Sequence, residues 1–394
     1  MAAFSYSLLQ SEYDNFNYPI ADVEVNGTSI VGDKNRIRMA NLTVDLTCGF
    51  EASQASFSLY NAYDATGTQF VFGRVKKYCT IGSLVKVYAG YGTTVREIFR
   101  GIICRTDFFI EEDDIPYVQV TAMDVKAIMM ANRYHKQLLA STYSGAVKEI
   151  FGQMVYQNLL GLDNLITDLN VFPTPDAPPV DIPDTGAALN PVDTPDSIEM
   201  VGESDYEFVV RAAKKFNYEF FSSGGQVNFR PAKSVSSTLI TLNNEVRFKS
   251  LNVSYDITGI VNKVEVRGVD VGKGKAVSFS KRNMNKLSKG MMAKMLVAGS
   301  EFVYTDPTVS SILDAKNRVE YLMDNMSYRF GYLEFEIYGI PEIVPGRFIA
   351  LDDFGDAVSN DFYVTNVQHR FNRDGEFLTK IIGRAQGMRN LLGL

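Results

Sequence analysis

A chain of 394 residues is too long for one ordinary hydrophobic core, and its length favours two or three domains. Hydrophobic residues make up 46% of it, which excludes wholesale disorder, and the net charge of −7 argues against general nucleic-acid binding. No apolar run is long enough to cross a bilayer and no signal peptide precedes the first acids. We therefore expect a protein that is made and kept in a cytoplasm unless a machine exports it.

The region from about residue 18 to 124 alternates apolar and polar residues between short polar turns, which predicts antiparallel strands. Strands without intervening helices indicate a small barrel or sandwich. The region ends in a pattern of three strands joined by two turns. The pattern consists of a strand at 82–87, a glycine-rich turn at 89–92, a strand at 99–103, an acidic turn at 111–114 and a strand at 117–120.

Two helices and a hairpin are predicted next. The first helix, which Ser144 could cap, has one amphipathic stripe made of Val147, Ile150, Phe151, Met154 and Val155. The second helix opens with the capping box Ser204-Asp205-Tyr206-Glu207, and its buried face is made of Val209, Ala212, Ala213 and Phe216. Strands at 218–221 and 226–229 then form the hairpin.

Charge and proline are distributed unevenly. Between Glu149 and Val210 there are twelve Asp and Glu and no Lys or Arg, and seven of the thirteen prolines lie between Pro173 and Pro195. Because proline removes a backbone donor, we expect a long surface loop or arm at 161–200. Residues 273–294 contain seven Lys and Arg and no acid. Each segment alone is typical of a solvated face, but together they allow acidic and basic surfaces to meet between subunits.

Strands resume from residue 237, and a helix is predicted around 311–329. Its apolar face is made of Ile312, Ala315, Val319, Leu322, Met323 and Met326. The end of the chain then repeats the three-strand pattern of the first half. The second copy consists of a strand at 346–351, a turn at 352–355, a strand at 362–367, a turn at 372–375 and a strand at 377–381. We predict two similar barrels, the second of which is discontinuous in sequence.

A search for catalytic motifs finds none that is complete. There is no HExxH motif, and Gly272-Lys273-Gly274-Lys275 lacks the spacing of a phosphate loop. The three cysteines, Cys48, Cys79 and Cys104, are widely spaced and fit neither a disulfide framework nor a CxxC metal site, so buried free thiols are expected.

The sequence contains the residues for a Cys–His nucleophile, Cys104 with His135 or His369, but no catalytic motif surrounds them. The acidic pairs Glu111-Glu112 and Asp352-Asp353 lie in predicted turns, where acids are common. A glycosidase pair could still be formed by carboxylates distant in sequence. We predict no enzyme activity, no catalytic residue, no metal and no cofactor.

Two regions carry a family resemblance. Residues 339–349, 362–369 and 375–379 resemble the C-terminal signature of the phage late control gene D family, and 203–221 resembles its helix-hairpin module. These proteins are baseplate hubs of contractile phage tails and related injection machines. The residues that carry the resemblance, with structural roles, are Pro341, Pro345, Gly346, Tyr363, His369, Gly375, Ser204, Asp205 and Phe208.

The expected fold class is mainly β with α+β insertions, namely two tube-type antiparallel β-barrels plus a helix-hairpin middle domain. We place the first barrel at 1–125 and the middle domain, which includes the loop 161–200, at 126–236. The second barrel takes up 237–270 and 330–388, and the basic segment with its helix is inserted at 271–329.

The resemblance implies a homotrimer whose barrels form a pseudo-sixfold ring that joins the hexameric tail tube to the trimeric central spike. The implied partners are the tail tube protein, a separate central spike protein and other baseplate proteins, with no membrane in the resting particle and no specific nucleic-acid binding. Relatives of the valine-glycine-repeat type continue into a spike, whereas this sequence ends at Leu394, so we expect the spike to be a separate protein.

The implied location is the baseplate of a virion or tail-like particle, assembled in the host bacterial cytoplasm. Two alternatives stay open, a tail-tip hub of a non-contractile tail and a baseplate-associated cell-wall hydrolase.

Overall fold

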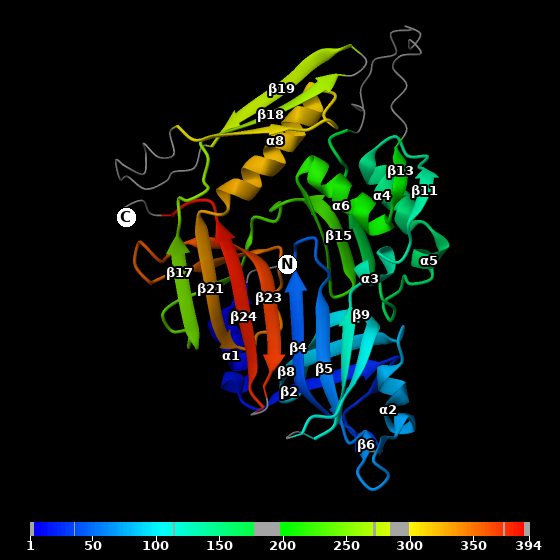
Figure 1. Cartoon of the computed structure of the whole chain (residues 1–394). Coiled ribbons are helices and arrows are strands. Elements are labelled where there is room, and N and C mark those ends of the chain that lie inside the picture. The colour runs from blue at the N-terminus through cyan, green and yellow to red at the C-terminus, as the bar shows by residue number, and fades with distance from the viewer. Residues whose placement is uncertain are drawn as a thin grey trace.

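The fold is mainly β with helical insertions, as the sequence predicts (Figure 1). The computed structural model describes residues 4–34, 36–112, 115–176, 198–270, 273–283, 299–372 and 375–389. Residues 177–197 of the acidic, proline-rich arm and 284–294 of the basic segment, together with Gly272, Asp113, Asp114 and Leu394, lie outside these residues. In the described part, no helix combines the length and the apolar character that crossing a bilayer requires.

Fourteen of the described strands form one hydrogen-bonded sheet. Those from the first half are β1 (Phe4–Ser5), β2 (Pro19–Val25), β3 (Thr28–Ser29), β4 (Arg38–Thr47), β5 (Gln54–Tyr60), β8 (Leu84–Tyr91), β9 (Thr94–Phe109) and β10 (Tyr117–Met123). Those from the second half are β16 (Thr238–Leu242), β17 (Ser250–Tyr255), β21 (Gly331–Tyr338), β22 (Phe348–Leu351), β23 (Asp361–Phe371) and β24 (Phe377–Ala385).

The two halves of this sheet have the same strand order. Six strands of the first half lie in the order β2-β8-β9-β10-β5-β4, and six of the second lie in the order β16-β22-β23-β24-β21-β17. Each set, numbered along the chain, has its strands in the spatial order 1-4-5-6-3-2. A one-residue bulge also recurs at the same place, at Cys104 on β9 facing β10 and at Thr365 on β23 facing β24. The repeat in the sequence is therefore a repeat of topology.

The two sets join edge to edge, because β23 of the second pairs with β4 of the first. The result is a continuous antiparallel path, β17-β21-β24-β23-β4-β5-β10-β9, which we call the eight-strand wall (Figure 1). One apolar core underlies both sets, and Tyr91 of the first donates a 3.0 Å hydrogen bond to the Gly339 carbonyl beside the second. The proposed division of the chain into domains stays a prediction.

Two local expectations for the barrels are wrong. The segment 89–92 is not a turn, since β8 runs through Tyr91 and only the following residues turn. Gly90 is there because a side chain would collide with the Thr94 carbonyl across the hairpin, a close backbone approach that glycine permits. The second set is also not wholly antiparallel, because β16 pairs in parallel with both β1 and β22. No turn joins these strands, so local sequence does not encode their relative direction.

Short elements complete the first half. They are α1 (Tyr6–Glu12), the 3-10 helix η1 (Asp14–Phe16), the hairpin β6 (Tyr63–Asp64) with β7 (Gln69–Phe70), and α2 (Phe72–Cys79). Aromatic rings of α1 and η1 pack between the two sets, where Phe16 contacts both Tyr91 and Tyr338.

The middle of the chain forms a separate apolar cluster beside the wall. Its elements are α3 (Lys126–Met129), β11 (Tyr134–Gln137), α4 (Tyr143–Phe151), α5 (Met154–Gln157), β12 (Asp168–Val171), β13 (Glu199–Glu203), α6 (Asp205–Phe216), β14 (Tyr218–Ser223) and β15 (Gln226–Pro231). The predicted capping box is present, since Ser204 accepts from the Glu207 amide and Glu207 accepts from the Ser204 amide. The predicted hairpin is β14 and β15.

The first predicted helix is shorter than its stripe suggests. Thr142, not Ser144, caps α4, because the Thr142 hydroxyl accepts from the Gly145 amide while Ser144 bonds to Thr174. The helix ends at Phe151 before Gly152, so Met154 belongs to α5 and is 78% exposed.

A third cluster forms the inserted unit at the top of Figure 1. It consists of β18 (Lys263–Asp270), β19 (Lys275–Arg282), β20 (Glu301–Thr305) and α8 (Ile312–Ser327). Ser311 caps α8, and the predicted apolar face packs against β18 and β19 except for Ile312, which is 65% exposed at the start of the helix.

Replacing Ser204 tests the capping of α6. In Ser204→Ala the amide of Glu207 loses its acceptor, which should lower the local opening free energy of α6 by about 1 kcal/mol. Amide hydrogen exchange in the first turn of α6 measures this. Ser204→Asp keeps an acceptor and is the matched control, and equal protection in the alanine and aspartate variants would contradict the assignment.

Candidate functional site

The junction between the two strand sets is the first part of the candidate site. Along β23, residues Asn366–Arg370 pair with Thr47–Thr43 of β4, and the amide of Cys48 extends the ladder by donating to the Thr365 carbonyl at 3.1 Å. We call this pairing the inner seam. Its core-facing residues are Val44, Leu46, Val367 and His369, all at most 4% exposed. On the solvent face Gln368 donates a 2.7 Å hydrogen bond to Asp45.

His369 lies on the core side of the inner seam. Its Nδ1 is 2.8 Å from the Thr379 hydroxyl, while Nε2 is buried without a hydrogen-bond partner among the described residues. Burial lowers the pKa of His369 to about 4, because charging the ring would leave a cation in an apolar core. His369 is therefore a neutral packing residue at neutral pH.

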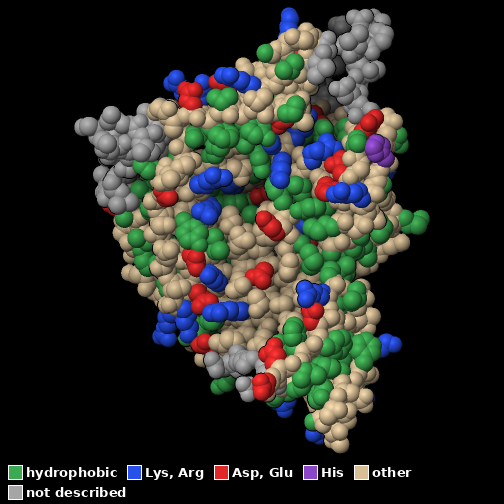
Figure 2. Space-filling view, in the orientation of Figure 1, with side chains coloured by type: hydrophobic (Ala, Val, Ile, Leu, Met, Phe, Trp, Pro, Cys, Tyr) green, Lys and Arg blue, Asp and Glu red, His purple; other side chains and the backbone are tan. Residues whose placement is uncertain are grey.

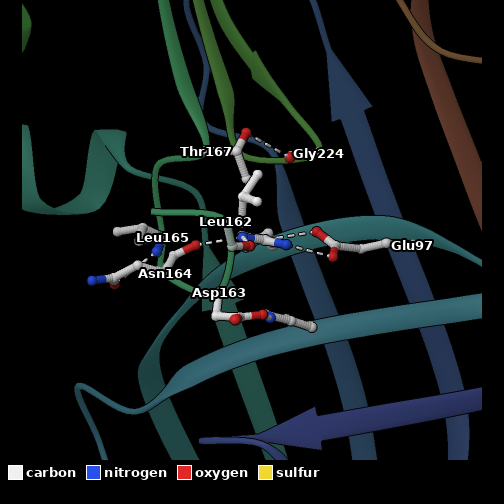
Figure 3. A network of polar contacts seen from close by, with 9 residues as sticks. Glu97, Leu162, Asp163, Asn164, Leu165, Thr167 and Gly224 are labelled. Carbon is white, nitrogen blue, oxygen red and sulfur yellow. Dashed lines mark hydrogen bonds and ion pairs between the residues drawn. The ribbon is translucent and has the colours of Figure 1, made fainter. Parts of the chain in front are cut away.

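A buried arginine ties the middle cluster to the first strand set (Figure 3). Arg100 on β9 makes two hydrogen bonds to Glu97, at 2.7 and 2.6 Å. Its Nη1 donates to the carbonyls of Leu162 and Asn164 at 2.6 and 2.5 Å, in the loop before β12. Arg100 is 7% exposed, so it holds this loop against the wall with charge-assisted bonds from a shielded position.

A second buried arginine ties the same cluster to the second strand set. Arg230 and Glu219 lie opposite each other on β15 and β14 and form an ion pair at 2.7 Å. Arg230 also donates to the Gly346 carbonyl at 2.7 Å, and the Tyr363 hydroxyl donates to Glu219. Burial raises the pKa of Glu219, although Arg230 and Tyr363 oppose that shift. The four residues form one network across the junction.

The structure brings two of the nine predicted site residues, from two different strands or loops, into one polar network. Gly346 and Tyr363 meet in the Glu219–Arg230 network. Pro341 and Pro345 are buried in the segment before β22, and Gly375 lies exposed with φ +80° before β24.

The other predicted residues lie elsewhere. His369 belongs to the inner seam, and Ser204 and Phe208 belong to α6, where Phe208 is fully buried. Asp205, also buried, accepts hydrogen bonds from the hydroxyls of Tyr134 and Tyr156. The predicted residues thus lie in four places, namely the junction with the segment before β22, the turn before β24, the inner seam and α6.

Sequence reasoning missed Glu219, Arg230 and Arg100. A usable signal existed for the first two, because a single acid and a single base stand opposite each other in an otherwise uncharged hairpin. No such signal exists for Arg100, whose partners are backbone carbonyls more than 60 residues away.

The structure does not assemble the catalytic pairs considered from sequence. Cys104 donates to the Ile102 carbonyl, His369 bonds to Thr379, and His135 is exposed on β11. In the described residues, no three His, Cys, Asp or Glu side chains are grouped as a metal site would need. Cys48 and Cys79 are buried free thiols, whereas Cys104 is half-buried.

A matched pair of glycine variants tests the second arginine junction. Gly346 and Gly355 both have positive φ, +79° and +81°, but a Cβ at 346 would lie 2.8 Å from Arg230 Nη2 and Phe221 Cζ, whereas a Cβ at 355 meets nothing within 4 Å. In both alanine variants, holding a residue with a side chain at positive φ costs ~1–2 kcal/mol of stability. Gly346→Ala should lose about 1–3 kcal/mol more through overpacking. Thermal unfolding compares them, and equal midpoints would refute the close fit.

The burial of His369 predicts a pH dependence of stability. Its folded pKa of about 4 is below the usual value, so its contribution is fully present above pH 6.5 and is lost as pH falls toward 4. Within that window the free energy of unfolding should fall by up to about 1.4 kcal/mol per pH unit from this residue. In His369→Gln that part of the slope should vanish. Urea unfolding between pH 7 and 4 checks it, and identical slopes would contradict a buried neutral ring.

Comparison with known proteins finds similar three-dimensional structures but no similar sequence. A scan against models of protein families and a search of curated proteins find no match. Among solved structures, a tail protein from Neisseria meningitidis MC58 is similar with a TM-score of 0.62 at 11% identity, covering 93% of this chain and 97% of that one. The 43 kDa tail protein of prophage MuSo2 from Shewanella oneidensis gives 0.63 at 10% identity, covering 93% and 98%.

The Escherichia coli protein c3393, described as a component of the type VI secretion system with structural similarity to the T4 tail proteins gp27 and gp5, gives a TM-score of 0.51 at 11% identity, covering 94% and 80%. At such low identities the likeness concerns the fold. Over nearly its whole length, this chain shares the fold of these two tail proteins.

Proposed function

We propose that the chain is a structural component of a tail baseplate, a hub that forms a homotrimer with pseudo-sixfold symmetry and joins a hexameric tail tube to a trimeric central spike. The observation that carries this proposal is the duplicated strand order within one sheet. Three chains that each carry two similar sets offer six similar surfaces, whereas their other parts keep threefold symmetry.

The inner seam supports this arrangement because it places the two sets of strands side by side in one sheet. A tube of identical subunits needs its repeated units in one orientation around an axis. Here the two sets continue one antiparallel path through β23 and β4, rather than stacking face to face. Two neighbouring positions of a six-unit ring are therefore filled by one chain.

The two buried arginines support a rigid connector role. Arg100 and Arg230 bind the middle cluster to the first and second sets respectively, so that cluster spans both. A connector between a tube and a spike must keep this geometry under load, and fully paired buried charges restrict alternative arrangements. In this proposal Ser204, Asp205, Phe208, Gly346, Tyr363 and the other predicted residues act through structure, not catalysis.

The exposed face of the wall carries charges of both signs (Figure 2). Glu334 pairs with Lys380 on the neighbouring strand β24, and Glu336 pairs with Arg370 of β23 across the intervening β24. A surface with paired charges has a weak net field and therefore attracts charged molecules only weakly.

The finer assignments belong to the same proposal. The domains are 1–125, 126–236, 237–270 with 330–388, and the insertion 271–329. The partners are the tail tube protein, a separate central spike and other baseplate proteins, in a virion or tail-like particle assembled in the host bacterial cytoplasm. The full-length coverage of two tail proteins supports this reading over that of a cell-wall hydrolase.

The oligomeric state tests the proposal. The purified full chain should have a native mass three times the chain mass of 43.9 kDa by light scattering or native mass spectrometry. The same preparation should leave a peptidoglycan suspension turbid. A species that stays monomeric at every concentration, or that clears peptidoglycan, would overturn the hub assignment.

A further inference from the structure

The eight-strand wall ends in two open edges. Among the described residues, β17 pairs on one side only, with β21, and residues 105–109 of β9 pair only with β10. These are the two ends of the path, β17 being at the left of the wall in Figure 1. An exposed strand edge offers a row of unpaired backbone groups to another strand.

The repeat relates these open edges to the inner seam. In the shared strand order, β17 of the second set is equivalent to β4 of the first. In the same way, β9 of the first set is equivalent to β23 of the second. The inner seam is the pairing of a β23 position with a β4 position. Its equivalent would pair β9 of one chain with β17 of another.

We propose that β9 and β17 form an intersubunit seam between copies of this chain, with the register of the inner seam. This inference rests on the proposed function and deepens it by naming the surfaces that close the ring. Because eight strands is an even number, an antiparallel path continues through such a seam without interruption, and three copies close it.

The register follows from the bulges and the ladders. The bulges at Cys104 and Thr365 align β9 with β23, and the pairings through β10, β5 and β24, β21 align β4 with β17. Carrying the inner seam across this alignment gives the pairs Arg105 with Asp256, Thr106 with Tyr255, Asp107 with Ser254, Phe108 with Val253, and Phe109 with Asn252.

Burial at equivalent positions supports a missing partner. His369 and Val44, which face each other in the inner seam, are 1% and 0% exposed. Their equivalents at the open edges are Phe108, which is 45% exposed, and Val253, which is only partly buried. A second strand at this edge would cover the Phe108 ring and complete the burial of Val253.

Charge and sequence support the same pairing. Arg105 forms a 2.7 Å ion pair with Asp107 on its own strand, but its side chain is 71% exposed. It would stand opposite the exposed Asp256, which accepts a hydrogen bond from the Thr258 amide, and opposite charges across a strand pair are stabilising. β17 itself, Ser250–Tyr255, contains no charged residue, proline or bulge. Those are the devices by which proteins protect an edge that stays in solvent, so their absence from this strand indicates an edge that is used.

Disulfide trapping tests the seam in the full-length chain. Asp107 and Ser254 are equivalent to Gln368 and Asp45, a pair that does not exchange backbone hydrogen bonds, because the Cys48 amide bond to Thr365 assigns those bonds to alternate pairs. In such a pair the Cα atoms lie about 4.5 Å apart and the side chains are closer than in the alternate pairs, which falls within the Cα separation of about 4.4–6.8 Å that a disulfide spans. The double variant Asp107→Cys, Ser254→Cys should give a reducible covalent dimer and trimer on mild oxidation with oxidised glutathione.

The control is the double variant Asp107→Cys, Asn252→Cys, which shifts the register by two residues on the same face. Its sulfurs would be diagonal neighbours roughly 7–8 Å apart, too far to bridge, so it should stay largely uncrosslinked, as should each single variant. Faster crosslinking of the shifted pair, or none in either pair of a trimeric protein, would overturn this seam and leave the trimer standing. A wild-type chain that is monomeric overturns the hub itself.

A charge exchange gives a second measurement that does not depend on cysteine. Arg105→Asp alone and Asp256→Arg alone each place like charges opposite one another in all three seams. Each should raise the protein concentration needed for half-maximal trimer by roughly tenfold. The combined variant should regain most of the wild-type affinity, and a combined variant no better than the singles would contradict the pairing of Arg105 with Asp256.

Discussion

The requirement that the backbone groups of a buried strand find hydrogen-bond partners governs this architecture. β23 meets that requirement with three neighbours, since its first residues pair with β22, its later residues pair with β4, and β24 covers its other edge. The change of partner along one strand is what joins two otherwise similar sets into a single wall. Without it, the two sets would be separate sheets joined only through their shared apolar core and side-chain contacts such as Tyr91 with Gly339.

Buried charge performs the complementary task of orienting the middle cluster. Arg100 and Arg230 reach backbone carbonyls in a neighbouring part of the chain, and each is neutralised by a glutamate from its own hairpin or strand. Carbonyl acceptors make this contact specific in direction, since a guanidinium donates along fixed lines. The cluster is therefore bonded to both sets of strands by directional contacts, in addition to apolar packing.

Local features were predictable from the sequence, and contacts between distant segments were not. The capping box at Ser204 and the hairpin that follows α6 depend on residues a few positions apart, and both are present. The repeated three-strand pattern was visible because turns and alternation recur. The pairing of β23 with β4 links residues more than 300 positions apart, and no local pattern encodes it. Thr142 rather than Ser144 caps α4 because Ser144 is hydrogen-bonded to Thr174, which lies 30 residues away in the sequence.

The inner seam also has a consequence for the order of events during synthesis. β4 is complete within the first 47 residues, but the strand that covers its edge ends at residue 371. Because a ribosome adds about 5–20 residues per second, that edge stays uncovered for tens of seconds after it is made. The nascent first half is thus exposed to pairing with other nascent chains for most of its translation. We therefore expect the yield of correctly folded chain to depend on polysome density and chaperone supply as well as on sequence.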